Sequence, residues 1–96
     1  MKKVHNLELP AAFADDVYSG HKPFDIRDAD GGFQAGDYII YRVVDKSGAH
    51  VEHAVEDRRF KITYVFSGGG IKEGYVIIGI KHSGSVKKMR ERAKKS

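Results

Sequence analysis

Three residues whose side chains can do chemistry lie close together in one short segment: Lys22, Asp25 and Arg27. Residues 22–28 alternate apolar and polar, so Asp25 and Arg27 point to the same face of an extended chain. Arginine can bind a phosphate or carboxylate through two parallel hydrogen bonds, and a desolvated lysine can act as a base or nucleophile. If this face lines a cleft, the three residues form an anion-binding or catalytic site. The alternative is a solvated strand face with an ordinary ion pair.

The elements that must position these residues are short and mostly extended. Pro10 and Gly20 punctuate a predicted helix over residues 10–19, with Phe13 and Val17 facing the core. Alternating or strongly apolar runs predict strands over 4–9, 22–28, 38–45, 59–66 and 75–80, and 51–56 is a candidate edge strand. The run 59–66 places Phe60, Ile62 and Tyr64 on one face. We therefore predict an α+β, mainly β fold, a small β-barrel of five to six strands with one early α-helix.

Length and charge divide the chain into a body and a tail. Its 96 residues suffice for one domain. Residues 83–96 hold six Lys or Arg and one Glu, whereas 1–82 are nearly balanced, with 11 Lys or Arg and 12 Asp or Glu. We predict a domain over 1–82 and a basic C-terminal helix or disordered arm over 83–96. In that arm Lys87, Lys88 and Arg90 are candidate nucleic-acid contacts, and a solubilising end is the alternative.

Several function classes are disfavoured by what the sequence lacks. No cysteine is present, which excludes disulfides and thiolate chemistry. No apolar run suits a membrane span or signal peptide, so we expect a cytoplasmic protein with no membrane partner. The histidines are scattered, and we expect neither a metal site nor a cofactor. Phe33, in a polar loop, and Tyr75, beside a glycine, are the aromatic residues expected to be accessible for stacking on bases.

The order of motifs resembles the ASCH domain, a branch of the PUA-like superfamily, and in particular a small subfamily found in bacteria and phages. The resemblance runs over residues 4–82 and rests on His5-x-Leu7-x-Leu9-Pro10, on Gly20-x-Lys22-x-Phe24-Asp25-Ile26-Arg27 and on the downstream Gly36-Asp37. It implies a PUA-like β-barrel whose cleft is floored by the Gly-x-Lys-x-x-Asp-x-Arg segment. It also implies RNA binding, and in some members hydrolysis of an acetylated cytidine nucleoside.

Three functions follow as hypotheses. The first is an RNA-binding module, not an enzyme, that holds RNA or a nucleotide-like ligand in the cleft. The second is a small hydrolase or ribonuclease with Lys22 and Asp25 as catalytic residues. Asp25 stands where those hydrolases have a threonine, which disfavours this hypothesis because a carboxylate cannot replace a hydroxyl nucleophile. The third is an accessory protein of a phage or mobile element that binds a host protein. The residues leave the oligomeric state open.

Overall fold

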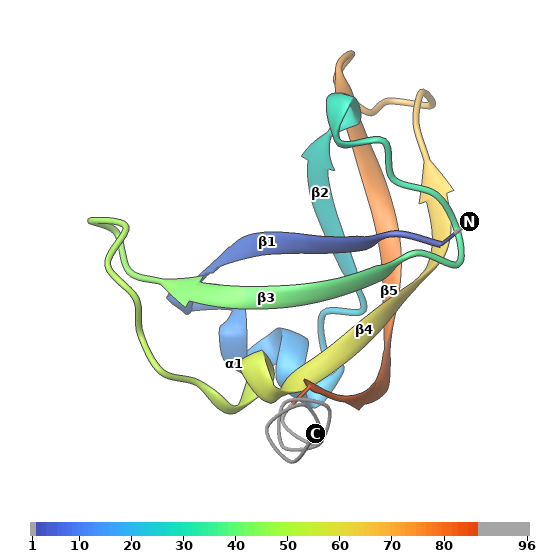
Figure 1. The fold of residues 1–96 in the computed structure, drawn as a ribbon. Helices are drawn as coiled ribbons and strands as arrows, with labels where there is room; N and C mark the ends of the chain where they lie inside the picture. Colours follow the sequence, from blue (N-terminus) through green and yellow to red (C-terminus); the bar gives the residue numbers. More distant parts are fainter. Residues whose placement is uncertain (1, 87–96) are drawn as a thin grey trace.

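The chain folds into a curled sheet of five strands with one α-helix, in a computed structural model that describes residues 2–86 (Figure 1). The sheet order is β1-β3-β4-β5-β2, with β1 and β3 parallel and the other neighbours antiparallel. The elements are β1 (Val4–Pro10), α1 (Ala11–Ser19), β2 (Phe24–Asp28), β3 (Tyr38–Val44), β4 (Arg58–Phe66) and β5 (Tyr75–Ser85), with short 3-10 helices η1 (Ala29–Gly31) and η2 (Ala54–Asp57). The predicted mainly β fold with one early helix is confirmed.

The sheet forms a half-barrel, not a closed barrel, because β1 and β2 are edge strands that do not pair with each other. The edge strand predicted over 51–56 is wrong. Only an isolated bridge joins Val44 to His50, and the chain then turns into η2. The Glu56 carboxylate accepts a hydrogen bond from the backbone N–H of Val43 and so replaces the strand partner that this part of β3 would otherwise need.

The core lies between the inner face of the sheet and α1. Its central side chains are almost fully buried: Leu9, Ile39, Tyr41, Val43, Ile62 and Ile78. On α1 the buried residues are Ala14 and Val17, and the helix ends at Gly20, whose φ of 87° needs a residue without a Cβ. The prediction that Phe13 faces the core is wrong, since its side chain is 44% exposed. Its ring lies beneath the Lys22 ammonium group instead.

A β-bulge changes the direction of the side chains along β4. Ile62 pairs with Ile80, but Tyr64 pairs with Gly79, so β4 carries one extra residue, Thr63, at this point. Tyr64 is therefore 59% exposed, and the prediction that it shares the inner face of Phe60 and Ile62 is wrong.

The folded body extends past the predicted boundary at residue 82. β5 continues to Ser85, and the side chain of Val86 is buried. The first residues assigned to the arm therefore belong to the sheet. Lys87, Lys88 and Arg90 lie outside the described residues.

Candidate functional site

Asp25 and Arg27 meet in the interior of the half-barrel. One Asp25 oxygen, Oδ2, accepts hydrogen bonds from Arg27 Nε at 3.0 Å, Arg27 Nη2 at 2.9 Å and the Tyr41 hydroxyl at 2.9 Å. The other oxygen accepts from the backbone N–H of Ile26. Burial, together with the negative charge of Asp25, raises the pKa of Tyr41, so its hydroxyl stays protonated and donates. The carboxylate is thus fully occupied by this chain's own donors.

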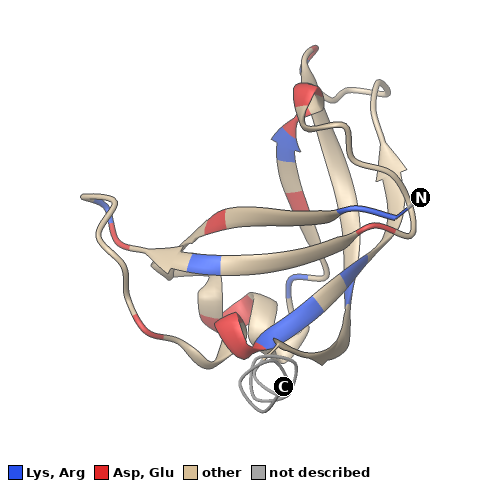
Figure 2. Cartoon of the chain, in the orientation of Figure 1, with Lys and Arg blue, Asp and Glu red and all other residues tan. Residues whose placement is uncertain are grey.

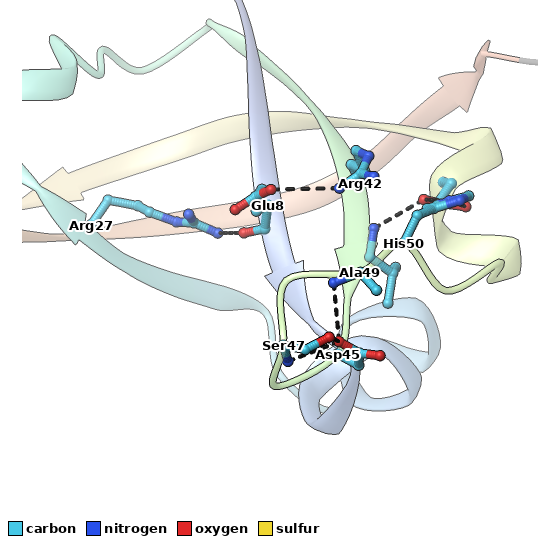
Figure 3. A network of polar contacts seen from close by, with 9 residues as sticks. Glu8, Arg27, Arg42, Asp45, Ser47, Ala49 and His50 are labelled. Carbon is cyan, nitrogen blue, oxygen red and sulfur yellow. Dashed lines mark hydrogen bonds and ion pairs between the residues drawn. The ribbon is translucent and has the colours of Figure 1, made fainter.

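Arg27 also connects the two open edges of the sheet. Its Nη2 donates to the backbone carbonyl of Glu8 on β1 at 2.7 Å, while the Glu8 carboxylate forms an exposed ion pair with Arg42 (Figure 3). Since β1 and β2 share no backbone ladder, this side chain joins strands that the sheet leaves apart. The Asp25–Arg27 pair therefore has a structural role.

Lys22 lies on the other side of the strand from Asp25. Its Nζ is 4.7 Å from the centre of the Phe13 ring and 5.1 Å from that of Phe24, and both rings are partly exposed. Cation–π contact with two rings holds the ammonium group at the surface. Of the three residues predicted to share a site, the structure brings Asp25 and Arg27 together and places Lys22 on the outer face.

The outer face of β4 and β5 carries a row of cations, which we call the cationic row: Lys22, Arg59, Lys61 and Lys81. Lys61 and Lys81 are directly paired across the two strands, and both point outward because their neighbours Phe60, Ile62 and Ile80 are buried. Figure 2 shows blue positions along β4 and on β5, whereas red positions lie on α1, on the segment after β3, on β1, and on β2 and the turn that follows it.

Arg59 is held in place within the row. Its guanidinium carbon is 4.2 Å from the centre of the Tyr38 ring, and its Nε donates to the Ser83 carbonyl at 2.8 Å. A cation stacked on a ring loses little conformational freedom when it binds an anion.

Apolar side chains occupy the same outer face, beside the cationic row. We call them the outer platform: Phe24, Ile26, Tyr64, Phe66 and Ile77. Four of them are exposed, at 39% for Phe24, 53% for Ile26, 59% for Tyr64 and 37% for Phe66. The rings of Tyr64 and Phe66 are nearly parallel, with an interplanar angle of 11° and centroids 6.3 Å apart.

The two aromatic residues predicted to be accessible differ in exposure. Tyr75 is 39% exposed, at the start of β5, with the Lys72 ammonium over its ring. Phe33 is half-buried and packs against the His5 ring and the core. The loop that carries Phe33 is fixed by Asp37, which accepts hydrogen bonds from the backbone N–H groups of Lys3 and Gln34 and pairs with His5.

The pKa of Asp37 reflects this network. Burial by itself would raise it, but the hydrogen bond with His5 and those from the two backbone N–H groups together outweigh burial and hold it below its ordinary value. The folded chain therefore favours the ionised form of this carboxyl.

A groove of about 870 Å³ lies between β1, β3 and the segment 50–57. Its lining includes the carboxylates of Glu8, Glu52, Glu56 and Asp57, with Arg42 as the one Lys or Arg among its lining residues. Burial would raise the pKa of Glu56, but hydrogen bonds from the Val43 N–H and from His50 outweigh it and lower the pKa. The groove is acidic and repels an anionic ligand, although it is large. Within residues 2–86 no group of three or more His, Asp or Glu side chains is arranged to hold a metal ion.

Apart from Lys22, the residues of the outer face were not among the predicted site residues. Lys61 and Tyr64 lie in a predicted strand, but only the cross-strand register shows that Lys61 meets Lys81 and that Tyr64 turns outward. The alternation of Arg59 and Lys61 with the buried Phe60 and Ile62 indicates that these two cations point outward, but it indicates neither the meeting with Lys81 nor the exposure of Tyr64.

No helix within residues 2–86 is both long enough and apolar enough to cross a bilayer. A search of the curated proteins finds no match. The family model described as "Domain of unknown function (DUF3850)" matches residues 4–80. This match spans β1 to the middle of β5 and covers most of the 96 residues, so the chain belongs to the DUF3850 family.

Proposed function

We propose that this chain is a binding module for RNA and that it binds through the cationic row on the outer face of β4 and β5. The observation that carries the proposal is that no carboxylate of the described residues pairs with these cations. Within the part of the chain that the structure describes, none of the four cations forms an ion pair with an Asp or Glu. Four positive charges thus share one face with no neutralising partner from residues 2–86.

The pairing of Lys61 with Lys81 supports this proposal. Like charges directly opposite each other in an antiparallel pair destabilise a sheet, since their Cβ atoms are only about 4.5–5.5 Å apart. A polyanion on this face removes that repulsion. Phosphates are such a partner, and their contacts with Lys and Arg supply most of the sequence-independent affinity for nucleic acid.

The shape of this face favours an extended ligand. The hollow next to the row is lined by Lys22 and Lys81 but also by Val17 of α1 and the buried Phe60, so it lies between α1 and the sheet and not on the outer face. It measures about 170 Å³. Pockets that enclose a drug-sized ligand measure about 300–1,000 Å³. A chain of nucleotides that lies along the strands needs no such enclosure.

The resemblance to the ASCH domain supports the same function. A mainly β half-barrel with one early helix is compatible with a PUA-like fold, and the wider family is associated with RNA. The proposal differs from the expected cleft in one respect. It assigns Asp25 and Arg27 to the interior and keeps Lys22 at the surface. The hydrolase alternative receives no support, because Asp25 is occupied by four donors of this chain.

The test is a fluorescence-anisotropy titration of a labelled ten-nucleotide RNA at several salt concentrations. The variant Lys61→Gln/Lys81→Gln removes two charges from the row, and Arg42→Gln/Lys46→Gln removes one from β3 and one from the turn that follows it as a matched control. We expect the first pair to weaken binding and to reduce the slope of log K against log salt by about 1 per lysine. The control pair should bind like wild type.

Two results would reject the proposal: no saturable binding by wild type, or equal losses in both pairs. Lys87→Gln/Lys88→Gln tests the contribution of the basic arm separately. If only this variant loses affinity, RNA binding belongs to the arm and not to the sheet.

A further inference from the structure

We infer that the outer platform stacks on unpaired bases, so that the ligand of this face is single-stranded RNA and not duplex RNA. This inference rests on the proposed function, which by itself requires only phosphate contacts. It concerns five apolar side chains that lie on the outer face of the sheet and not in the core: Phe24, Ile26, Tyr64, Phe66 and Ile77.

Two separate features of the chain turn these side chains outward. On β2 the polar residues Asp25 and Arg27 occupy the interior, so Phe24 and Ile26 face the outside. On β4 the bulge at Thr63 turns Tyr64 and Phe66 outward, while Val65 packs against the core. The apolar outer surface on β2 and the one on β4 therefore have two independent structural causes.

The register brings the platform into two ordered rows. Phe24 on β2 and Tyr64 on β4 both pair with Gly79 of β5, and the Thr63 hydroxyl lies where a Cβ on Gly79 would stand. Ile26 and Phe66 both pair with Ile77. The first row therefore has an aromatic ring on each side of a glycine, and the second adds a third ring. Stacking on aromatic rings is the usual way in which proteins bind unpaired bases without regard to sequence.

The charges around the platform indicate which ligand binds it. Three lysines lie at the same end of the platform: Lys22 just before β2, Lys61 on β4 and Lys81 on β5. The Lys22 ammonium lies over the Phe24 ring itself. A second copy of this chain would bring its own lysines to the same apolar area, whereas a nucleic acid brings bases for the rings and phosphates for the lysines.

Single strands fit this arrangement better than duplexes. In a duplex the bases are stacked on each other, and the faces of their rings are closed to a protein surface. A single strand can splay its bases onto Tyr64 and Phe24 while its phosphates follow the cationic row. The platform thus predicts a preference that the lysines alone would not give.

The experiment measures the affinity of the full-length chain for a ten-nucleotide single-stranded RNA and for a duplex of the same length. The variants are Tyr64→Ala/Phe66→Ala and, as a matched control, Tyr18→Ala, which removes an exposed aromatic ring from α1. Thermal melts by circular dichroism verify that each variant folds. A 2-aminopurine base in the single strand reports stacking by quenching of its fluorescence.

We expect wild type to prefer the single strand, and Tyr64→Ala/Phe66→Ala to weaken that binding about 10- to 100-fold, with loss of the quenching. Tyr18→Ala should change neither. Equal binding of single strand and duplex, unaffected by the aromatic variant but lost in Lys61→Gln/Lys81→Gln, would overturn the inference and leave the proposed function intact. Failure of wild type to bind either RNA would reject both. A wild-type dimer in sedimentation velocity that Tyr64→Ala/Phe66→Ala dissociates would assign the platform to a second copy instead.

Discussion

Replacing Arg27 with methionine tests whether the Asp25–Arg27 pair is structural. Methionine keeps much of the apolar stem but removes the guanidinium group, which leaves the Asp25 carboxylate buried with only the Tyr41 hydroxyl and one N–H as donors. Removal of one partner of a buried pair costs about 3–5 kcal/mol. Since the side chain of Arg27 is 21% exposed and that of Asp25 is 9% exposed, we expect the lower end of that range, about 3 kcal/mol.

The assay is urea unfolding followed by circular dichroism, and Arg42→Met is the matched control. Both arginines contact Glu8, but Arg42 reaches its exposed carboxylate at 3.5 Å, with side chains 54% and 66% exposed. Such surface pairs contribute about 0–1 kcal/mol. For a domain of this size, a loss of 3 kcal/mol lowers Tm by about 12–24 °C. Equal losses of stability in Arg27→Met and Arg42→Met would refute the view that Arg27 holds the half-barrel together.

Two further predictions concern the same interior. Tyr41→Phe removes one hydrogen bond to a carboxylate without changing the packing, so we expect a loss of about 1.5–3 kcal/mol in urea unfolding; a loss below 0.5 kcal/mol would contradict the network. The second prediction concerns pH. The pKa of Asp37 is lowered from 3.8 in the folded chain, so its ionised form contributes stability that is present above pH 3.8 and is lost as the pH falls through the folded value. The difference in Tm between wild type and Asp37→Asn should therefore be largest near pH 7 and shrink toward pH 2, and a constant difference would disprove the assignment.

The helix and the five strands could be predicted because each depends on local patterns. Pro10 and Gly20 mark the helix, and the β-prone runs mark the strands closely, except that β5 continues to Ser85, well past its predicted end at residue 80. The half-barrel shape could not be predicted in the same way. Whether β1 meets β2 depends on the curvature of the whole sheet, and the segment 51–56 forms no strand because a glutamate side chain takes the place of a strand partner.

The candidate site shows more clearly what local sequence patterns cannot predict. Alternation on β2 indicated correctly that Asp25 and Arg27 share a face, but not that this face is the interior. A pattern of period two cannot tell which face is buried when the polar residues form a satisfied network. The meeting of Lys61 with Lys81 depends on long-range register, and the exposure of Tyr64 depends on a bulge. Neither has a local sequence signal.

The central claim is that RNA contacts the outer face of β4 and β5. The most direct measurement is a nitrogen-15 NMR titration of the full-length chain with a ten-nucleotide single-stranded RNA, which reports every backbone amide of this 10.7 kDa protein. We predict that the largest shifts occur in β4 and β5, at Lys61, Tyr64, Gly79 and Lys81. Shifts concentrated instead on β1 and the segment 50–57, which line the acidic groove, would contradict the claim.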